Sequence, residues 1–392
     1  MTEASTGLDP AEIPARMTGR MTAHPQTGGC HEAFLPSPCV QNHAANLHVL
    51  PDGTLACVWF AGTMEGMSDI SIYMSRLAPG ADTWSAPERL SDDPARSEQN
   101  PVLFTTPRGT VWLVFTAQTA GDQDGAIIRR RVSEDGGLSF GPVETLTDRP
   151  GTFVRQPPVF AADGTWLLPV FRCVSEPGRR WSGNIDTAGV LVSTDDGARF
   201  TLHDVPDSLG AVHMNIVPGA GGRPLAFFRN RFAEQVLRSV SADDGMTWSA
   251  PEPTVLPNNN SSIQAIRLGD GRIAMVHNPV NAAMSSDRRL SLYDEIDGDD
   301  DTTPAPASAR AAIWGVPRAP LRLTILDPSS SRILHHRDLD TGDGYCLTNN
   351  SQDARNREYS YPSIVEGPDG ALHIAYTYYR RAIKHVRLAS PD

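Results

Sequence analysis

The sequence lacks the segments that carry a protein into or across a membrane. None of its uncharged apolar runs approaches the roughly 18 residues that a membrane helix needs. The N-terminal stretch MTEASTGLDPAEIPARMTGR carries acids and prolines where a secretory signal needs a basic start and an apolar core of about 7–15 residues. We therefore expect a cytoplasmic protein that does not bind a membrane.

Cysteine and glycine-rich motifs are also scarce. The five cysteines are odd in number and widely scattered, at Cys30, Cys39, Cys57, Cys173 and Cys346. They form neither a disulfide framework nor a CxxC metal knuckle, so we expect buried free thiols. No glycine-rich loop follows a strand and opens a helix, which leaves nucleotide chemistry without support. The sequence predicts no metal and no cofactor.

Positive charge is in deficit. Lysine and arginine number 34 against 46 aspartates and glutamates, a formal net charge of −12. Such a balance argues against a nucleic-acid partner. Any acidic ligand must then be bound by local arginines. The sequence does not indicate an oligomeric state.

One short phrase recurs. Three segments share the pattern SxDxGxxF/W, at residues 133–140, 193–200 and 241–248, and weaker candidates lie at 82–90 and 326–334. In such a phrase the aspartate accepts hydrogen bonds from the backbone of its own turn, the glycine supplies a positive φ, and the aromatic ring packs between sheets. We interpret the phrase as a structural turn.

A second repeat predicts the fold. Six units of strand, DG-like turn and strand begin near residues 42, 100, 155, 213, 260 and 361. Four-stranded sheets that recur every 40–60 residues or so are typical of a propeller. We therefore predict an all-β, six-bladed β-propeller with Asp-containing turns. An antiparallel sandwich is the alternative, although it would lack the recurring phrase.

Two stretches fall outside the blades. Residues 1–30 read as an N-terminal extension, and residues 31–392 as a single propeller domain. The segment CHEAFLP could add the outer strand to the last blade and close the ring. The acidic, proline-bearing stretch 296–311 reads as a solvated loop inserted in the fifth blade.

Polar residues begin the inner strand of every unit. Inner strands converge on the axis of a propeller, and these residues differ from blade to blade, which favours one central binding site over a small site repeated in each blade. A plug of mutually hydrogen-bonded polar residues is the alternative. The residues are His43, Gln99, Asn100, Arg155, Gln156, His213, Asn215, Asn259, Asn260 and Tyr361.

The SxDxGxTW turns resemble the Asp-box, or BNR, repeats of the sialidase superfamily, and the six units resemble that family's blades across almost the whole chain. The resemblance implies three arginines that hold a substrate carboxylate, a tyrosine nucleophile paired with a glutamate, and an aspartate that acts as acid and base. Tyr361 opens YPSIVEGPDG, where the family places its tyrosine. Arg229 in FFRNRF resembles the second arginine, with Arg231 as a neighbouring substitute, and Arg318 in VPRAPLRL resembles the third.

Three positions depart from the family pattern. His43 stands where the first arginine is expected, and His213 stands where the glutamate partner of the tyrosine is expected. The loop after ACVWF lacks an aspartate at the acid/base place, but it supplies Glu65 and Asp69 nearby.

These residues suggest a separate chemical role for each side chain. A tyrosine needs a proton acceptor or a cation beside it to act as nucleophile or base, and His213 could supply either. Arg229 and Arg318 could clamp a carboxylate in a forked arrangement, and Glu65, if shielded from water, could protonate a leaving oxygen. Further substrate contacts are expected from Arg155, Asn100, Gln156, Asn215, Asn259, Asn260, Arg231 and Asp69.

The function that follows is an exo-acting glycoside hydrolase that removes a terminal acidic sugar, of sialic or uronic acid type, from an oligosaccharide. Two alternatives fit the same residues. Histidine and tyrosine around an arginine-bound carboxylate could abstract the neighbouring proton and eliminate the glycosidic oxygen, as a uronate lyase does. The propeller could also bind glycans without catalysis.

Overall fold

The computed structural model describes residues 8–25, 27–219, 223–292, 295, 310–329 and 332–391. These residues form strands and three short helical segments, η1 (Pro10–Glu12), α1 (Ile13–Arg16) and η3 (Ala282–Met284). No helix within these ranges is long and apolar enough to span a membrane.

The strands form six antiparallel sheets, which follow one another along the chain except that the two N-terminal strands join the last sheet. The first three sheets contain β3 (Gln41–Val49), β4 (Leu55–Gly62), β5 (Ser71–Leu77) and β6 (Glu88–Arg89); β7 (Arg96–Thr105), β8 (Val111–Thr119), β9 (Asp122–Ser133) and β10 (Glu144–Thr147); and β11 (Thr152–Val154), β12 (Val159–Phe160), β13 (Trp166–Arg172), β14 (Thr187–Ser193) and β15 (Thr201–Asp204). The other three contain β16 (Ala211–Val217), β17 (Leu225–Asn230), β18 (Gln235–Val240) and β19 (Glu252–Pro257); β20 (Gln264–Arg267), β21 (Ile273–His277), β22 (Leu321–Leu326) and β23 (Ile333–Asp340); and β24 (Tyr359–Glu366), β25 (Leu372–Tyr378), β26 (Ala382–Leu388), β2 (Cys30–Phe34) and β1 (Thr22–Ala23).

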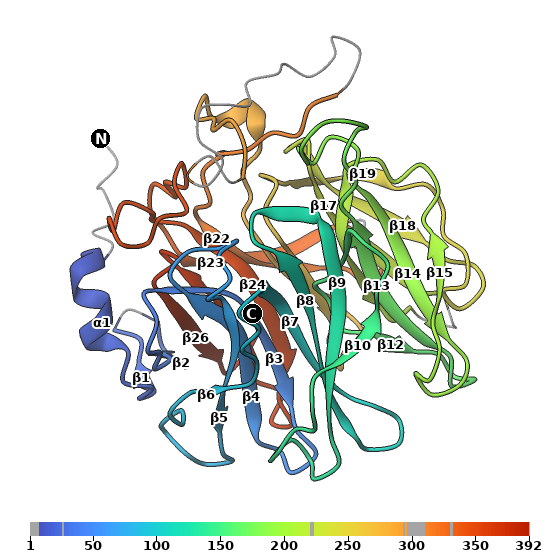
Figure 1. Cartoon of the computed structure of the whole chain (residues 1–392). Coiled ribbons are helices and arrows are strands. Elements are labelled where there is room, and N and C mark those ends of the chain that lie inside the picture. The colour runs from blue at the N-terminus through green and yellow to red at the C-terminus, as the bar shows by residue number, and fades with distance from the viewer. Residues whose placement is uncertain are drawn as a thin grey trace.

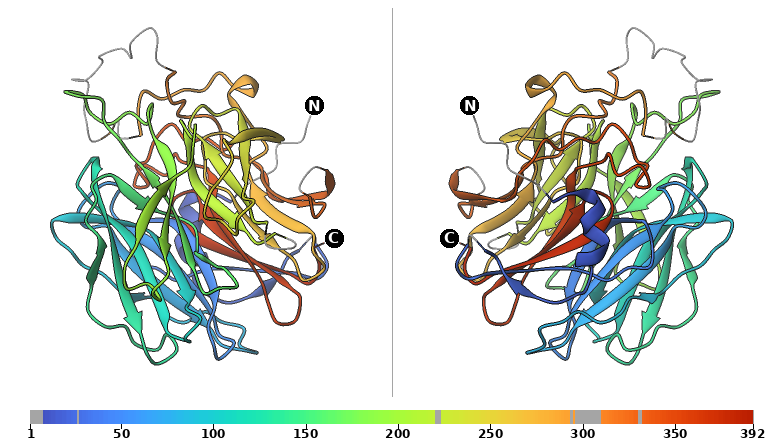
Figure 2. Two further views of the ribbon diagram at one scale, coloured as in Figure 1. Left: turned by 90° about the vertical axis from the view of Figure 1, so that its right-hand side faces the viewer. Right: turned by 90° about the vertical axis from the view of Figure 1, so that its left-hand side faces the viewer.

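These sheets are the blades of a propeller, which confirms the predicted fold. In Figure 1 they follow one another from blue through green to red, and the last blade lies beside the first. The inner strand β24 contacts β3, and β20 contacts β24, so the blades meet around a common centre. Figure 2 shows η3 and the segments around it, in orange, at the top of both side views.

The core lies between neighbouring blades. Aromatic side chains fill one such interface, where the Trp112 and Trp166 rings lie 5.1 Å apart and the Phe104 ring lies 6.0 Å from Trp112. Burying a large apolar side chain contributes about 1.5–3 kcal/mol, and six such interfaces hold the ring together. All five cysteines are free, and Cys39 is the one that is only partly buried.

The Asp-containing turns connect the third and fourth strands of three blades. In the turn after β18, Asp243 accepts a hydrogen bond from the Thr247 backbone N–H at 2.8 Å, and the Ser241 hydroxyl accepts one from the Gly245 N–H at 2.8 Å. Gly245 has φ +95°, and Trp248 packs in the interface between the third and fourth blades. The turns are structural, as their sequence indicates.

The N-terminal region belongs to the last blade. Strand β2 pairs with β26, so CHEAFLP supplies the strand next to the blade's chain end. Ile13 of α1 is fully buried in the core formed with the fifth and sixth blades. Of the acidic insertion 296–311, residues 296–309 lie outside the described residues.

Candidate active site

Four of the inner strands share a β-bulge near their first residues. In β3, β7, β16 and β24 the pairing with the next strand shifts by a bulge, and the first bulged residue has a left-handed backbone. Non-glycine residues rarely adopt this conformation, and a bulge re-aims the side chain that it carries. The left-handed residues of these four bulges are Ala44 (φ 59°), Asn100 (φ 50°), His213 (φ 53°) and Tyr361 (φ 50°). Asn260 (φ 57°), which precedes β20, has the same backbone conformation outside a bulge. Ala44 in the bulge of the first blade is therefore equivalent to Tyr361 in the bulge of the sixth blade. His43 is the residue directly before Ala44.

Tyr361 lies at the centre of a cluster of arginines. Its ring is 5.4 Å from the Arg155 guanidinium carbon, 5.6 Å from that of Arg229 and 5.7 Å from that of Arg318. Arg229 Nη1 donates a 2.5 Å hydrogen bond to the Tyr361 hydroxyl. The side chain of Tyr361 is 6% exposed.

Arg229 is a buried cation without a carboxylate partner among the described residues. Besides Tyr361, its guanidinium donates to Asn260 Oδ1 at 2.8 Å and to His213 Nε2 at 3.4 Å. The residue is 1% exposed. Burial, together with the nearby Arg231 and Arg318 charges, lowers the pKa of the Arg229 guanidinium to about 9, which still leaves it protonated at neutral pH. A buried charge without a counter-charge is costly, so this position favours an anionic ligand.

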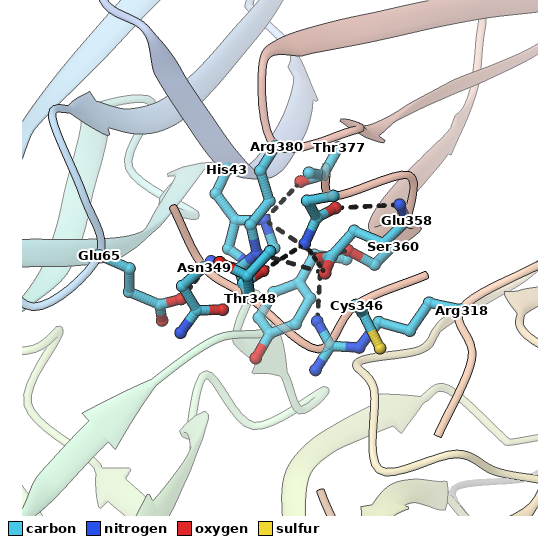
Figure 3. A network of polar contacts seen from close by, with 12 residues as sticks. His43, Glu65, Arg318, Cys346, Thr348, Asn349, Glu358, Ser360, Thr377 and Arg380 are labelled. Carbon is cyan, nitrogen blue, oxygen red and sulfur yellow. Dashed lines mark hydrogen bonds and ion pairs between the residues drawn. The ribbon is translucent and has the colours of Figure 1, made fainter. Parts of the chain in front are cut away.

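Arg318 is paired within the protein. Its Nη1 lies 2.9 Å from Glu358 Oε1. Glu358 also lies 3.3 Å from Arg380 Nε, and Arg380 Nη1 lies 2.5 Å from Glu65 Oε2. Figure 3 shows this network, with Glu65 and Arg318 at its opposite ends. Arg318 therefore already has a carboxylate partner within the protein, whereas the sequence predicts that both arginines are available for the carboxylate of a substrate.

Glu358 is the buried acid that neutralises this part of the site. Burial acts to raise the pKa of its carboxyl, but the guanidinium groups of Arg318 and Arg380 outweigh burial and hold the pKa well below its ordinary value. The Ser360 hydroxyl adds a 2.5 Å hydrogen bond to the same carboxylate.

The two histidines flank the Tyr361 ring. The His43 ring centroid lies 4.2 Å from that of Tyr361, and the His213 centroid lies 5.6 Å from it. Burial and nearby arginines, Arg380 for His43 and Arg229 for His213, lower the pKa of both imidazoles well below the ordinary value, so both are neutral at pH 7.

The hydrogen bonds of the histidines define what each can do. Since arginine can only donate, the contact with Arg229 makes His213 Nε2 an acceptor and puts its proton on Nδ1. His43 Nδ1 is 2.8 Å from the Thr377 hydroxyl. His43 Nε2 and His213 Nδ1 are buried and have no hydrogen-bond partner among the described residues. These two nitrogens are therefore available for a hydrogen bond to a water or a bound molecule.

Three predicted substrate contacts instead join blades to one another. Arg155 donates to the backbone carbonyls of Ala45 and Tyr361, at 3.2 and 3.1 Å. Gln156 donates to the Ile263 carbonyl, and Asn215 accepts from a backbone N–H of the fifth blade. Since these side chains use their polar atoms on neighbouring strands, they form the polar plug that the sequence left as an alternative.

The other predicted contacts lie nearer the site but are mostly occupied. Arg231 is buried against Asp186, with Nη2 2.7 Å from the carboxylate. Asn259 donates to the Pro317 carbonyl, and Asn260 to that of Ile313 in addition to its bond from Arg229. Asn100 is buried in the bulge of β7. Asp69 is exposed and accepts hydrogen bonds from Thr63 in its own loop, so it is not part of the cluster.

Sequence reasoning missed two members of the network. Glu358 reads in the sequence as a rim residue three positions before Tyr361, yet it is 1% exposed and binds two arginines. Arg380 lies in the hairpin turn between β25 and β26. The described residues contain no group of three or more His, Cys, Asp or Glu side chains that could hold a metal ion.

A family model for a BNR repeat-like domain matches residues 53–374. The chain belongs to this BNR repeat-like family. Curated protein sequences gave no match. Among solved structures, the chain is similar to a Hadza microbial sialidase, Hz136, with 12% identity and a TM-score of 0.67 over 89% of this chain and 66% of that one.

Two further structures are similar to this BNR repeat-like chain. A protein of unknown function from Dyadobacter fermentans has 15% identity and a TM-score of 0.66, over 92% of this chain and 99% of that one. The NanB sialidase of Streptococcus pneumoniae has 12% identity and a TM-score of 0.64, over 94% and 70%. At such identities the likeness shows the shared propeller fold.

Proposed function

We propose that this protein is a sialidase-like glycosidase that removes a terminal acidic sugar from an oligosaccharide. The observation that carries the proposal is Arg229, a buried guanidinium that contacts the Tyr361 hydroxyl and has no carboxylate partner among the described residues. A carboxylate on the sugar supplies the missing charge and places the anomeric carbon beside the tyrosine. Arg229 then binds the carboxylate of the sugar while Tyr361 reacts with its anomeric carbon, as the resemblance to sialidases implies.

The hydrolytic sequence assigns each group a step. The Tyr361 oxygen bonds to the anomeric carbon as the bond to the leaving oxygen breaks, and His43, whose Nε2 has no hydrogen-bond partner among the described residues, takes the phenolic proton. Glu65 in its protonated form gives the proton on Oε1 to the leaving oxygen, while Oε2 keeps its contact with Arg380. Water then attacks the same carbon and releases the tyrosine; the proton of the water goes to Glu65, and the histidine returns its proton to the Tyr361 oxygen.

Elimination is the second candidate, and one observation favours it. No carboxylate of the described residues is in hydrogen-bond contact with the Tyr361 hydroxyl; the side chain that contacts it is Arg229. A neutral histidine such as His43 then takes the proton next to the substrate carboxylate, and Arg229 stabilises the enolate-like charge. The Tyr361 hydroxyl gives its proton to the glycosidic oxygen as that oxygen leaves, and the product carries a new carbon–carbon double bond.

One experiment separates these functions. The purified protein is incubated with sialyl, glucuronyl and rhamnosyl-glucuronate oligosaccharides, and products are followed by mass spectrometry and ultraviolet absorbance. A gain of one water identifies hydrolysis, and absorbance of an unsaturated uronate identifies elimination. We expect Tyr361→Phe to lower turnover at least about a hundredfold in either case. Binding without turnover of any substrate would instead support a glycan-binding propeller.

A further inference from the structure

Arg380 occupies a strained turn. Tyr379, Arg380 and Arg381 connect β25 to β26, and the first two have φ values of 55° and 54°. Hairpin turns with two successive positive φ angles favour Asn-Gly, because the Cβ of a larger L-residue crowds its own backbone in the left-handed conformation. Strain of this kind persists where the surroundings hold the residue in place, and it is concentrated at functional sites.

Both the backbone and the side chain of Arg380 are held. Its carbonyl accepts hydrogen bonds from the Asn42 N–H at 2.8 Å and from the Ser351 hydroxyl at 3.2 Å. Its guanidinium is 1% exposed and lies between Glu65, 2.5 Å from Nη1, and Glu358, 3.3 Å from Nε. The turn of the sixth blade therefore reaches a carboxylate from the loop of the first blade.

The charges of the network balance within the protein. Glu65, Arg380, Glu358 and Arg318 alternate in sign along contacts of 2.5, 3.3 and 2.9 Å. Without Arg380, Glu65 would lose the cation that faces it, and Glu358 would keep only one arginine. Arg229 makes none of these contacts, so the network orders the reacting groups while Arg229 is left for the ligand charge.

From this geometry we infer that Arg380 is a positioning residue, which fixes the carboxylate of Glu65, the proposed proton donor, and, through Glu358, the orientation of Arg318. The inference rests on the proposed function for its effect on turnover. Arg380 does not touch the substrate. Its role is to keep the proton-transferring carboxylate and the second arginine in one arrangement (Figure 3).

The test compares Arg380→Gln with Arg380→Lys and with Arg381→Gln. Arg381 is a matched control because it lies in the same turn and donates to the Ser351 carbonyl. We expect Arg380→Gln to lower kcat at least about tenfold while KM changes by less than about threefold, because Arg229 still holds the substrate. The acid limb of the pH profile moves to higher pH because Glu358 loses a guanidinium. Arg380→Lys recovers part of the rate, and Arg381→Gln leaves it near that of the wild type.

A second measurement does not depend on activity. In a double-mutant cycle of Arg380→Gln and Glu65→Gln, followed by denaturant unfolding, the double variant should have a midpoint no lower than that of Arg380→Gln, because the unpaired carboxylate is gone. Additive midpoints would overturn the inference, as would equal rates for Arg380→Gln and Arg381→Gln. Absence of wild-type turnover on every acidic oligosaccharide would refute the proposed function alone, and the cycle would still decide the role of Arg380.

Discussion

At the scale of single residues, Arg229 and Arg318 differ although both lie over the Tyr361 ring. Arg318 already has Glu358, whereas Arg229 has no acid among the described residues. Replacing Arg229 with lysine keeps the charge but loses the forked pair of hydrogen bonds that a guanidinium can donate to a carboxylate. The fall in kcat/KM for the acid sugar should correspond to about 1.5–3 kcal/mol of lost transition-state stabilisation, and the fall for Arg318→Lys should be smaller. The methyl ester of the same sugar should be poor for the wild type and change little further. Equal wild-type rates on ester and acid would contradict the assignment of Arg229.

Glu358 makes stability depend on pH at the same scale. Its pKa is held well below the ordinary value of 4.5 by Arg318 and Arg380, against burial. A carboxyl with a depressed folded-state pKa stabilises the fold fully above its unfolded pKa and loses that contribution as the pH falls toward the folded value. Glu358→Gln should therefore unfold at lower denaturant at pH 7 and show a flatter dependence between about pH 5 and pH 3 than the wild type. Parallel curves for the two proteins would show that Glu358 does not carry this dependence.

At the scale of elements, the Asp-containing turns stabilise the blades without taking part in chemistry. Asp243→Ala removes acceptors for Thr247, and Gly245→Val places a side chain against Leu167 at a positive φ. Each change should lower the free energy of unfolding by about 1–3 kcal/mol and leave turnover of the folded protein near normal. Thermal melting and initial rates measure the two effects separately. A variant with wild-type melting and lost turnover would place the turn in the site.

The elements that could be predicted are those with local signals. The DG-like turns and the SxDxGxxF/W phrases mark hairpins by residues within a few positions of each other, so the blades and their number followed from the sequence. The partners of Arg318 and Glu65 did not, because Glu358 and Arg380 lie 40 residues from Arg318 and 315 from Glu65, respectively. A Tyr-Arg pair at a hairpin turn, where Asn-Gly is expected, was the local signal for Arg380.

At the scale of the whole molecule, the propeller is closed by two ends of the chain in one blade. Strand β2 pairs with β26 through Cys30–Leu388 to Phe34–Lys384, and Lys384 is buried between Glu32 and Asp340 at 2.8 and 2.9 Å. Because Tyr361 and Arg380 belong to this same blade, its closure also fixes the central site. The N-terminal residues thus support the site through their pairing with β26, and not through side chains within the site.

Ala33→Pro tests this closure. The hydrogen bond from Leu35 N–H to the Ile383 carbonyl sets the alternation along β2 and directs the Ala33 N–H toward β26. Proline removes that donor and leaves a buried carbonyl unpaired, so unfolding should need about 1–3 kcal/mol less free energy, whereas Ala33→Ser, which keeps the N–H, should differ little. An opened β26 edge also invites pairing between molecules, so light scattering should rise on mild heating. If Ala33→Pro melts and scatters as Ala33→Ser does, β2 does not hold the ring closed, and the remaining contacts of the sixth blade with the first must do so.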